Sequence, residues 1–149
     1  MRLGLDAGCP SCTAGFSAHR EMTYLIDTHT FLWILNTPAA VPASVHGICK
    51  NPTATLFISI VTPWEISIKC ALGKLNAGDV LDHFEALLMQ GGYTMLETKI
   101  QHVVRGGRLP SHHRDPFDRL LAAQALELRI PIISRDRVFD LYGVKRIWD

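Results

Sequence analysis

Residues 112–136, HHRDPFDRLLAAQALELRIPIISRD, predict a polar loop, a helix and a short buried strand. Asp115 and the proline after it are typical of a helix N-cap followed by the first helical position. Asp118 then falls at the third position of the helix. Residues 130–134 form a short run rich in β-branched side chains, which favours a strand. Asp136 lies just past the end of this predicted strand.

Apolar runs and helical segments alternate through the rest of the chain as well. Further strands are predicted at residues 24–26, 56–61, 93–96 and 146–148, and helices at 31–35, 42–51, 62–72, 79–91 and 100–104. The strands are continuous apolar runs, which is typical of strands buried on both faces of a parallel sheet. The pattern therefore predicts an α/β fold with helices on a mainly parallel sheet.

The helix after the second strand is predicted to start in the same way as the helix of the opening stretch. Thr62 suits the N-cap, Pro63 suits the first helical position, and Glu65 falls at the third, which is the capping-box pattern. Residues 115–118 have the same order of cap, proline and acid. Both helices are therefore expected to carry a carboxylate in their first turn.

Four acids follow strands or begin helices: Asp27, Glu65, Asp118 and Asp136. In a parallel sheet with right-handed crossovers the carboxyl ends of the strands share one edge, where ligands bind. Converging carboxylates repel one another unless a cation is present, and oxygen-only pockets suit Mg²⁺ or Mn²⁺. Capping explains Glu65 and Asp118 equally well, and a turn explains Asp136. Asp27, directly after a buried strand, needs a partner.

Composition limits the class of protein without deciding the function. A chain of 149 residues, 48% hydrophobic and 19% charged with a net charge of +1, suits one globular domain. The four cysteines match neither a zinc site nor a secreted disulfide scaffold, so the cytoplasm is the expected compartment. No apolar run is long enough for a membrane helix. We expect residues 1–21, with a lone CxxC at Cys9 and Cys12, to be a disordered extension and residues 22–149 to be the domain.

Four separated segments resemble PIN-domain proteins, specifically the VapC-type toxin ribonucleases of bacterial toxin–antitoxin pairs. The segments are YLIDTHTFLW, SIVTPWEISIKCALGKL, LPSHHRDPFDRLLAAQA and SRDRVFDLYGVKRIW. The resemblance covers essentially residues 22–149. It implies a three-layer α/β/α sandwich with a parallel central sheet. Thr62-Pro63 departs from the family, where a serine and a non-proline are common.

The resemblance implies an endoribonuclease that depends on Mg²⁺ or Mn²⁺. Its catalytic and metal-binding residues would be Asp27, Glu65, Asp118 and Asp136, with a metal-bound water attacking the phosphorus. Asp115 and Thr28 would support the site, although capping a helix is the simpler role for each. RNA phosphates would contact Arg114, Arg119, Arg135 and Arg137, for which solvation or pairing with acids is the alternative. The implied partners are an RNA substrate, a cognate antitoxin and a second copy of the chain.

Other interpretations remain open from the sequence. A catalytically silent PIN-like module that binds RNA or antitoxin would not need all four acids. A phosphatase of the haloacid-dehalogenase type would need a carboxylate two residues after Asp27, where His29 stands. His112 and His113 are more typical of solvated loop residues than of general acids. Trp33 and Trp64 lie in apolar helical runs, so core packing is expected rather than stacking on unpaired bases.

Overall fold

The computed structural model describes residues 22–112 and 114–149, and the expectations for residues 1–21 lie outside this part of the chain. Its five strands form a single sheet in the order β3-β2-β1-β4-β5, and every neighbouring pair is parallel. The strands are β1 Thr23–Ile26, β2 Thr55–Ser59, β3 Thr94–Leu96, β4 Ile132–Ile133 and β5 Arg146–Ile147. The predicted three-layer α/β/α sandwich is confirmed.

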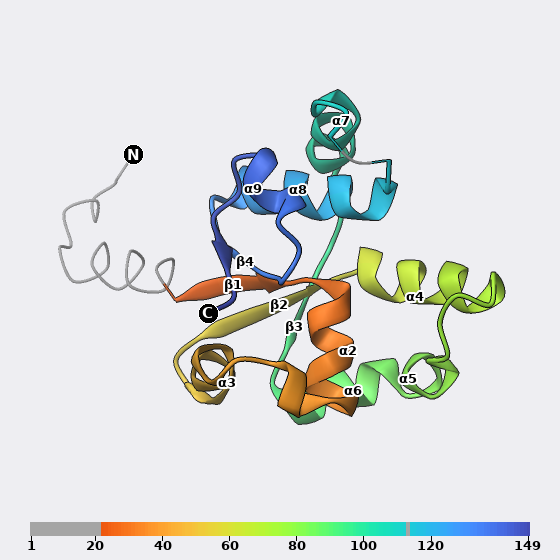
Figure 1. Ribbon diagram of the computed structural model, residues 1–149, viewed down its shortest axis with the longest axis vertical. Helices are drawn as coiled ribbons and strands as arrows, with labels where there is room; N and C mark the ends of the chain where they lie inside the picture. Colours follow the sequence, from red (N-terminus) through yellow and green to blue (C-terminus); the bar gives the residue numbers. More distant parts are fainter. Residues whose placement is uncertain (1–21, 113) are drawn as a thin grey trace, which may run out of the picture.

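Helices cover both faces of the sheet (Figure 1). One side carries α2 Thr28–Asn36, α3 Ala43–Lys50, α5 Gly78–Asp82 and α6 Phe84–Gly91, with a 3₁₀ turn at Pro38–Ala40. The other carries α8 Pro116–Leu128 and α9 Val138–Leu141, with α7 Ile100–Arg108 packed outside α8, while α4 Val61–Ala71 extends from the edge of the sheet. None of the helices in the described ranges is long and apolar enough to span a bilayer.

Successive strand residues supply two separate hydrophobic cores. In β1, Leu25 packs into the core beneath α8 and Ile26 into the core beneath α2 and α6. In β4, Ile132 and Ile133 divide between the two cores in the same way. This alternation follows from the period of two residues in a strand. Because both faces of these strands are buried, they appear in the sequence as continuous apolar runs.

The strand register places three polar residues in one row at the carboxyl edge. Ile26 of β1 pairs with Ile58 of β2 and with Ile133 of β4. The next residues along these three neighbouring strands are Asp27, Ser59 and Ser134, and all three are buried. Parallel pairing therefore aligns one acid between two hydroxyls at the edge where we expected a site.

The helix that carries Glu65 begins earlier than predicted. It starts at Val61, so Thr62 is not its N-cap and Glu65 does not lie in a capping box. The Ser59 hydroxyl accepts the Val61 N–H at 3.0 Å and donates to the side chain of Gln124 at 2.6 Å. A hydroxyl at the end of β2 thus binds the amide that starts the helix, and Pro63 falls inside the first turn.

Two other predicted helices differ in extent. The segment from Asp79 to Gly91 is two helices, because the chain breaks at His83, and Asp79 does not cap the first. Helix α7 runs on through Gly106-Gly107 to Arg108. Gly106 is buried against α8, where an added Cβ would lie 3.6 Å from the Arg119 carbonyl oxygen. Gly106 therefore lies inside a helix that packs on α8 and does not mark a helix end.

Candidate metal centre

A cleft of about 550 Å³ opens at the carboxyl edge of the sheet. Three of the four predicted acids line it, and the fourth, Glu65, is buried beside it. The residues that line the cleft are Asp27, His29, Thr30, Trp33, Lys69, Asp115, Asp118, Arg135, Asp136 and Arg137. Elements distant in sequence therefore bring acidic and basic side chains to one place.

The tightest group of acids joins α4 to the start of α8. One carboxylate oxygen from each of Glu65, Asp115 and Asp118 lies within 4.8 Å of the others. Asp115 is the predicted N-cap of α8, and its Oδ1 accepts the Phe117 N–H at 2.9 Å. The structure thus gives Asp115 a capping role and also places it among the clustered acids.

Glu65 provides the observation that a cation fits this cluster. Its side chain is 1% exposed, and its Oε1 has no hydrogen-bond donor among the described residues. A buried carboxylate oxygen without a donor is costly unless a cation contacts it. The available ligands are carboxylate oxygens, the type that Mg²⁺ and Mn²⁺ prefer. The residues present therefore fit a hard divalent cation.

Lys69 is a cation already present in the cluster. Its Nζ donates to Oε2 of Glu65 and lies 3.5 Å from Oδ2 of Asp115. Burial lowers the pKa of Lys69, but the hydrogen bond and charge of Glu65 outweigh this effect and raise it overall. The side chain therefore stays positively charged.

Asp27 is held in place by Ser134 on the neighbouring strand. The Ser134 hydroxyl donates to Oδ2 of Asp27 at 2.7 Å and accepts the N–H of Asp136 at 3.0 Å. Asp27 is 4% exposed, so this hydrogen bond compensates part of the cost of burying its carboxylate. Asp136 itself is exposed, and its Oδ1 accepts the Val138 N–H at the start of α9. Asp136 therefore has the role of a turn residue, which was the alternative interpretation, and it also lines the rim of the cleft.

The protonation of the acids reflects their crowding. Burial raises the pKa of Asp27 to about 6, although the hydrogen bond from Ser134 opposes this rise. Burial is also the main cause that raises the pKa of Asp118 to about 8, and the charge of Asp27 is the next largest. Without a divalent cation Asp118 therefore retains a proton at neutral pH. A divalent cation would favour its ionised form.

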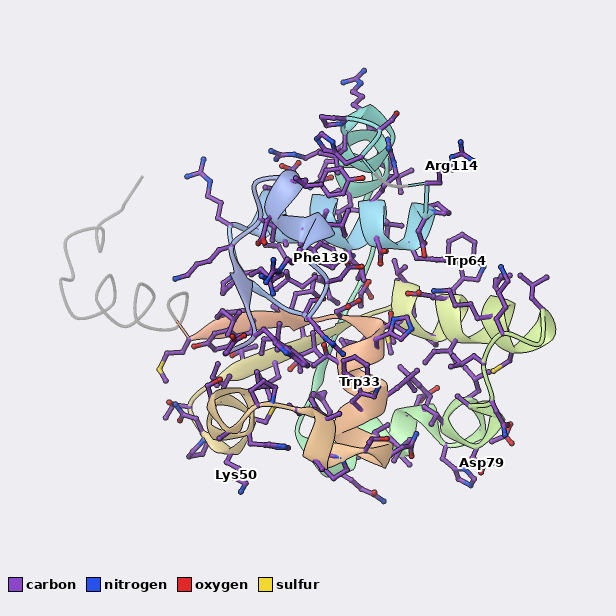
Figure 2. All side chains as sticks on the ribbon, viewed as in Figure 1. Trp33, Lys50, Trp64, Asp79, Arg114 and Phe139 are labelled. Carbon is purple, nitrogen blue, oxygen red and sulfur yellow. The ribbon has the colours of Figure 1, made fainter. Side chains whose placement is uncertain are left out.

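The four arginines predicted to contact RNA lie in different surroundings. Arg135 and Arg137 line the cleft. The guanidinium of Arg119 instead donates to the carbonyl oxygens of Gly107, Leu109 and Pro110, which joins α8 to the end of α7 and the loop after it. Arg114 is exposed and projects outward near the start of α8 (Figure 2). The geometry therefore supports a role at the cleft for two of the four.

Thr28 is buried, and its hydroxyl lies 3.3 Å from that of Thr62. Asp27, rather than Thr28, occupies the N-cap position of α2. Trp33 lines the cleft and packs against Trp148, with ring centroids 5.8 Å apart.

Trp64 projects from α4 (Figure 2) and is 53% exposed, so the expectation of core packing is wrong for it. His112 is exposed, with its ring 5.4 Å from that of Tyr142, and His113 lies outside the described residues.

Sequence reasoning missed Ser59, Ser134 and Lys69. Both serines end buried strands at the edge where the acids were expected, which is the signal that could have identified them. Lys69 follows Glu65 by four residues on one helix, a spacing that brings two side chains together.

The fold and the cleft define a class of protein: a parallel α/β/α sandwich with clustered carboxylates at the carboxyl edge of its sheet. A model of the PIN domain matches residues 24–145, and the chain therefore belongs to the PIN-domain family. No relative was found among curated protein sequences.

Solved structures with the same fold include three complexes. VapBC2 from Rickettsia felis bound to a DNA fragment from their promoter has a TM-score of 0.63 at 16% identity, covering 86% of this chain and 100% of the other. VapBC-1 from nontypeable Haemophilus influenzae has a TM-score of 0.61 at 21% identity, covering 85% and 97%. DNA-bound VapBC from Salmonella typhimurium has a TM-score of 0.63 at 16% identity, covering 85% and 97%. At these identities the similarity shows the fold.

Proposed function

We propose that the chain is a Mg²⁺- or Mn²⁺-dependent endoribonuclease that acts as the toxin of a toxin–antitoxin pair. The observation that carries the proposal is the cluster of Glu65, Asp115 and Asp118 beside a cleft that Asp27 and Asp136 also line, with a buried Glu65 Oε1 that has no donor in the described part of the chain. The cation would be held by carboxylates of Asp27, Glu65, Asp118 and Asp136, with Asp115 added because its oxygen lies in the tightest group.

The chain's own residues have separate tasks in this reaction. Ser134 fixes the orientation of Asp27 through its hydrogen bond, and Asp115 holds the start of α8 so that Asp118 faces the cleft. Arg135 and Arg137 supply positive charge at the rim, where a phosphodiester of RNA would approach. A bound divalent cation would activate a water and neutralise charge on the phosphoryl group.

The test is RNA cleavage by the purified protein with Mg²⁺ or Mn²⁺, read by sequencing the new 5′ ends. Asp27→Asn and Asp118→Asn should reduce cleavage by at least about 100-fold, since each removes a negatively charged ligand from the cluster. Asp79→Asn is the matched control, because Asp79 is exposed and far from the cleft (Figure 2). Cleavage that survives both cleft substitutions, or an absence of cleavage by the wild type, would refute the proposal.

An antitoxin partner is part of the same proposal. It is supported by the PIN-domain family and by the similar structures, which are titled as VapBC complexes. We assign this function to the domain of residues 22–149.

If the chain is a toxin, its expression should stop growth of a bacterial host. The product of an adjacent small gene should then restore growth and co-purify with the chain. Growth arrest that Asp27→Asn leaves unchanged would contradict a toxic nuclease.

A further inference from the structure

Lys69 contacts two of the acids that would hold a divalent cation. Glu65 and Lys69 lie one turn apart on α4, and the Lys69 side chain is 21% exposed where it reaches the cleft. Its ammonium contacts Glu65 and lies 3.5 Å from Asp115. These are two of the three acids in the tightest cluster, so the metal-free site is already partly neutralised by a residue of its own helix.

We propose that Lys69 is an internal counter-cation that competes with the divalent metal for Glu65 and Asp115. This inference rests on the proposed metal site. The ammonium holds one oxygen of each acid in the metal-free state, and binding of the metal to these carboxylates weakens or breaks both contacts. Metal binding is then an exchange of cations. Lys69 stabilises the folded arrangement of the clustered acids when no metal is bound. Because the metal must displace its ammonium, Lys69 also lowers the affinity for metal.

A contact with an aromatic ring also supports this view. The Nζ of Lys69 lies over the Phe117 ring, 5.9 Å from its centroid, so the ammonium approaches an aromatic face as well as the acids. Such a contact favours a fixed cation at this site. A lysine that served only as a solvated surface residue would have no reason to contact both Glu65 on its own helix and Asp115 at the start of α8.

The experiment is a calorimetric titration of the metal-free full chain with Mn²⁺. Lys69→Met removes the competing charge and keeps an apolar stem, so it should tighten Mn²⁺ binding about 10- to 100-fold, as expected for the loss of one hydrogen bond to a charged group. Lys50→Met is the matched control, because Lys50 is exposed on α3 away from the cleft (Figure 2). Lys69→Gln is the second variant should Lys69→Met not fold, and it should also tighten binding.

Thermal unfolding gives a readout that a purely structural role would not produce. In EDTA, Lys69→Met should unfold at a lower temperature than the wild type, because Glu65 and Asp115 lose their counter-charge. Saturating Mn²⁺ should remove this difference, since the metal then neutralises the acids. A variant that is destabilised equally with and without Mn²⁺ would show that Lys69 only supports the helix.

The outcomes separate this inference from the proposed function. Unchanged or weaker Mn²⁺ binding by Lys69→Met, with normal binding by the wild type, overturns competition and leaves the nuclease proposal intact. A wild type that binds no Mn²⁺ overturns both. Tighter binding by Lys69→Met but not by Lys50→Met establishes the exchange.

Discussion

Asp27 and Glu65 show two ways to bury a carboxylate in one site. Asp27 receives a hydrogen bond from a neutral hydroxyl, whereas Glu65 receives one from an ammonium and leaves its second oxygen without a donor in the described chain. A hydroxyl partner leaves the charge of Asp27 in place for a cation. The ammonium cancels part of the charge of Glu65. Asp27 therefore keeps its charge for a cation, whereas Glu65 shares its charge with Lys69.

Asp118 should make the metal-free protein less stable as the pH rises. Its pKa is about 8 in the folded protein and near 3.8 in the unfolded chain, so between these values the folded protein binds the additional proton. Unfolding then releases this proton, and the free energy of unfolding falls with rising pH, by up to about 1.4 kcal/mol per pH unit. Thermal or urea unfolding in EDTA between pH 6.5 and 8 measures the slope.

Asp118→Asn is the control for that slope, because an amide has the shape of the protonated acid and does not titrate. The difference between the two proteins isolates Asp118 from His102, whose pKa is lowered by burial and which acts in the opposite direction. Parallel stability curves for wild type and variant would contradict the raised pKa.

At the scale of secondary structure, the positions of most helices and strands could be predicted from hydrophobic period and caps. The start of α8 was predictable because Asp115 and Pro116 are adjacent in sequence and act locally. The start of α4 was not, because Ser59 binds the Val61 N–H from the preceding strand and makes the Thr62 cap unnecessary. Local patterns identified the acids, but the partners of the acids depend on which strands become neighbours.

Helix α7 packs closely on α8 through Gly106, and this contact limits the size of the side chain that position 106 can carry. A Cβ at Gly106 would lie 3.6 to 3.7 Å from atoms of α8, which is ordinary van der Waals contact. Gly106→Ala should therefore stabilise the protein by up to about 1 kcal/mol through helix propensity. Gly106→Leu should destabilise it by about 1–3 kcal/mol, since the longer side chain separates the helices.

Urea unfolding of the two Gly106 variants tests this limit. Gly107, where a Cβ would meet nothing within 4 Å, supplies the control, and Gly107→Leu should cost less than Gly106→Leu. Equal destabilisation by the two leucines would show that packing on α8 does not limit the size of the side chain at position 106.

At the scale of the whole molecule, the sequence indicated a parallel sheet but did not determine its strand order. Asp27 lies at the centre because β1 pairs with β2 on one side and β4 on the other. Right-handed crossovers predicted the shared edge, and this part of the expectation is confirmed. The hydrogen bond between Ser134 and Asp27 depends on β4 lying next to β1, which residue patterns alone do not reveal.

An exposed apolar face predicts that the protein forms a homodimer. Trp64 and Ile68 of α4 and Leu72 at its C-cap recur every four residues and are 53%, 39% and 62% exposed. Trp64 also shares an apolar groove with Val103 of α7. A continuous face of this kind is typical of a subunit interface. Light scattering should give twice the mass of the chain, and Ile68→Glu should give a monomer.

Met89→Glu is the control for the predicted dimer. Met89 is 83% exposed on α6 and does not belong to the α4 face, so its substitution should leave the mass unchanged. A monomeric wild type would contradict the predicted dimer. A dimer that only Met89→Glu dissociates would show that the subunits meet at a different surface.

The link between the first and fourth strands also has a consequence for biosynthesis. Asp27 and Ser134 are 107 residues apart, and a ribosome that adds about 5–20 residues per second needs roughly 5–20 s to make the second after the first. During that time the nascent chain lacks both the hydroxyl that orients Asp27 and the whole strand beside it. A growing polypeptide therefore cannot assemble the cleft before Ser134 and Asp136 have been synthesised, so Asp27 stays without its hydroxyl partner through most of the synthesis of this domain.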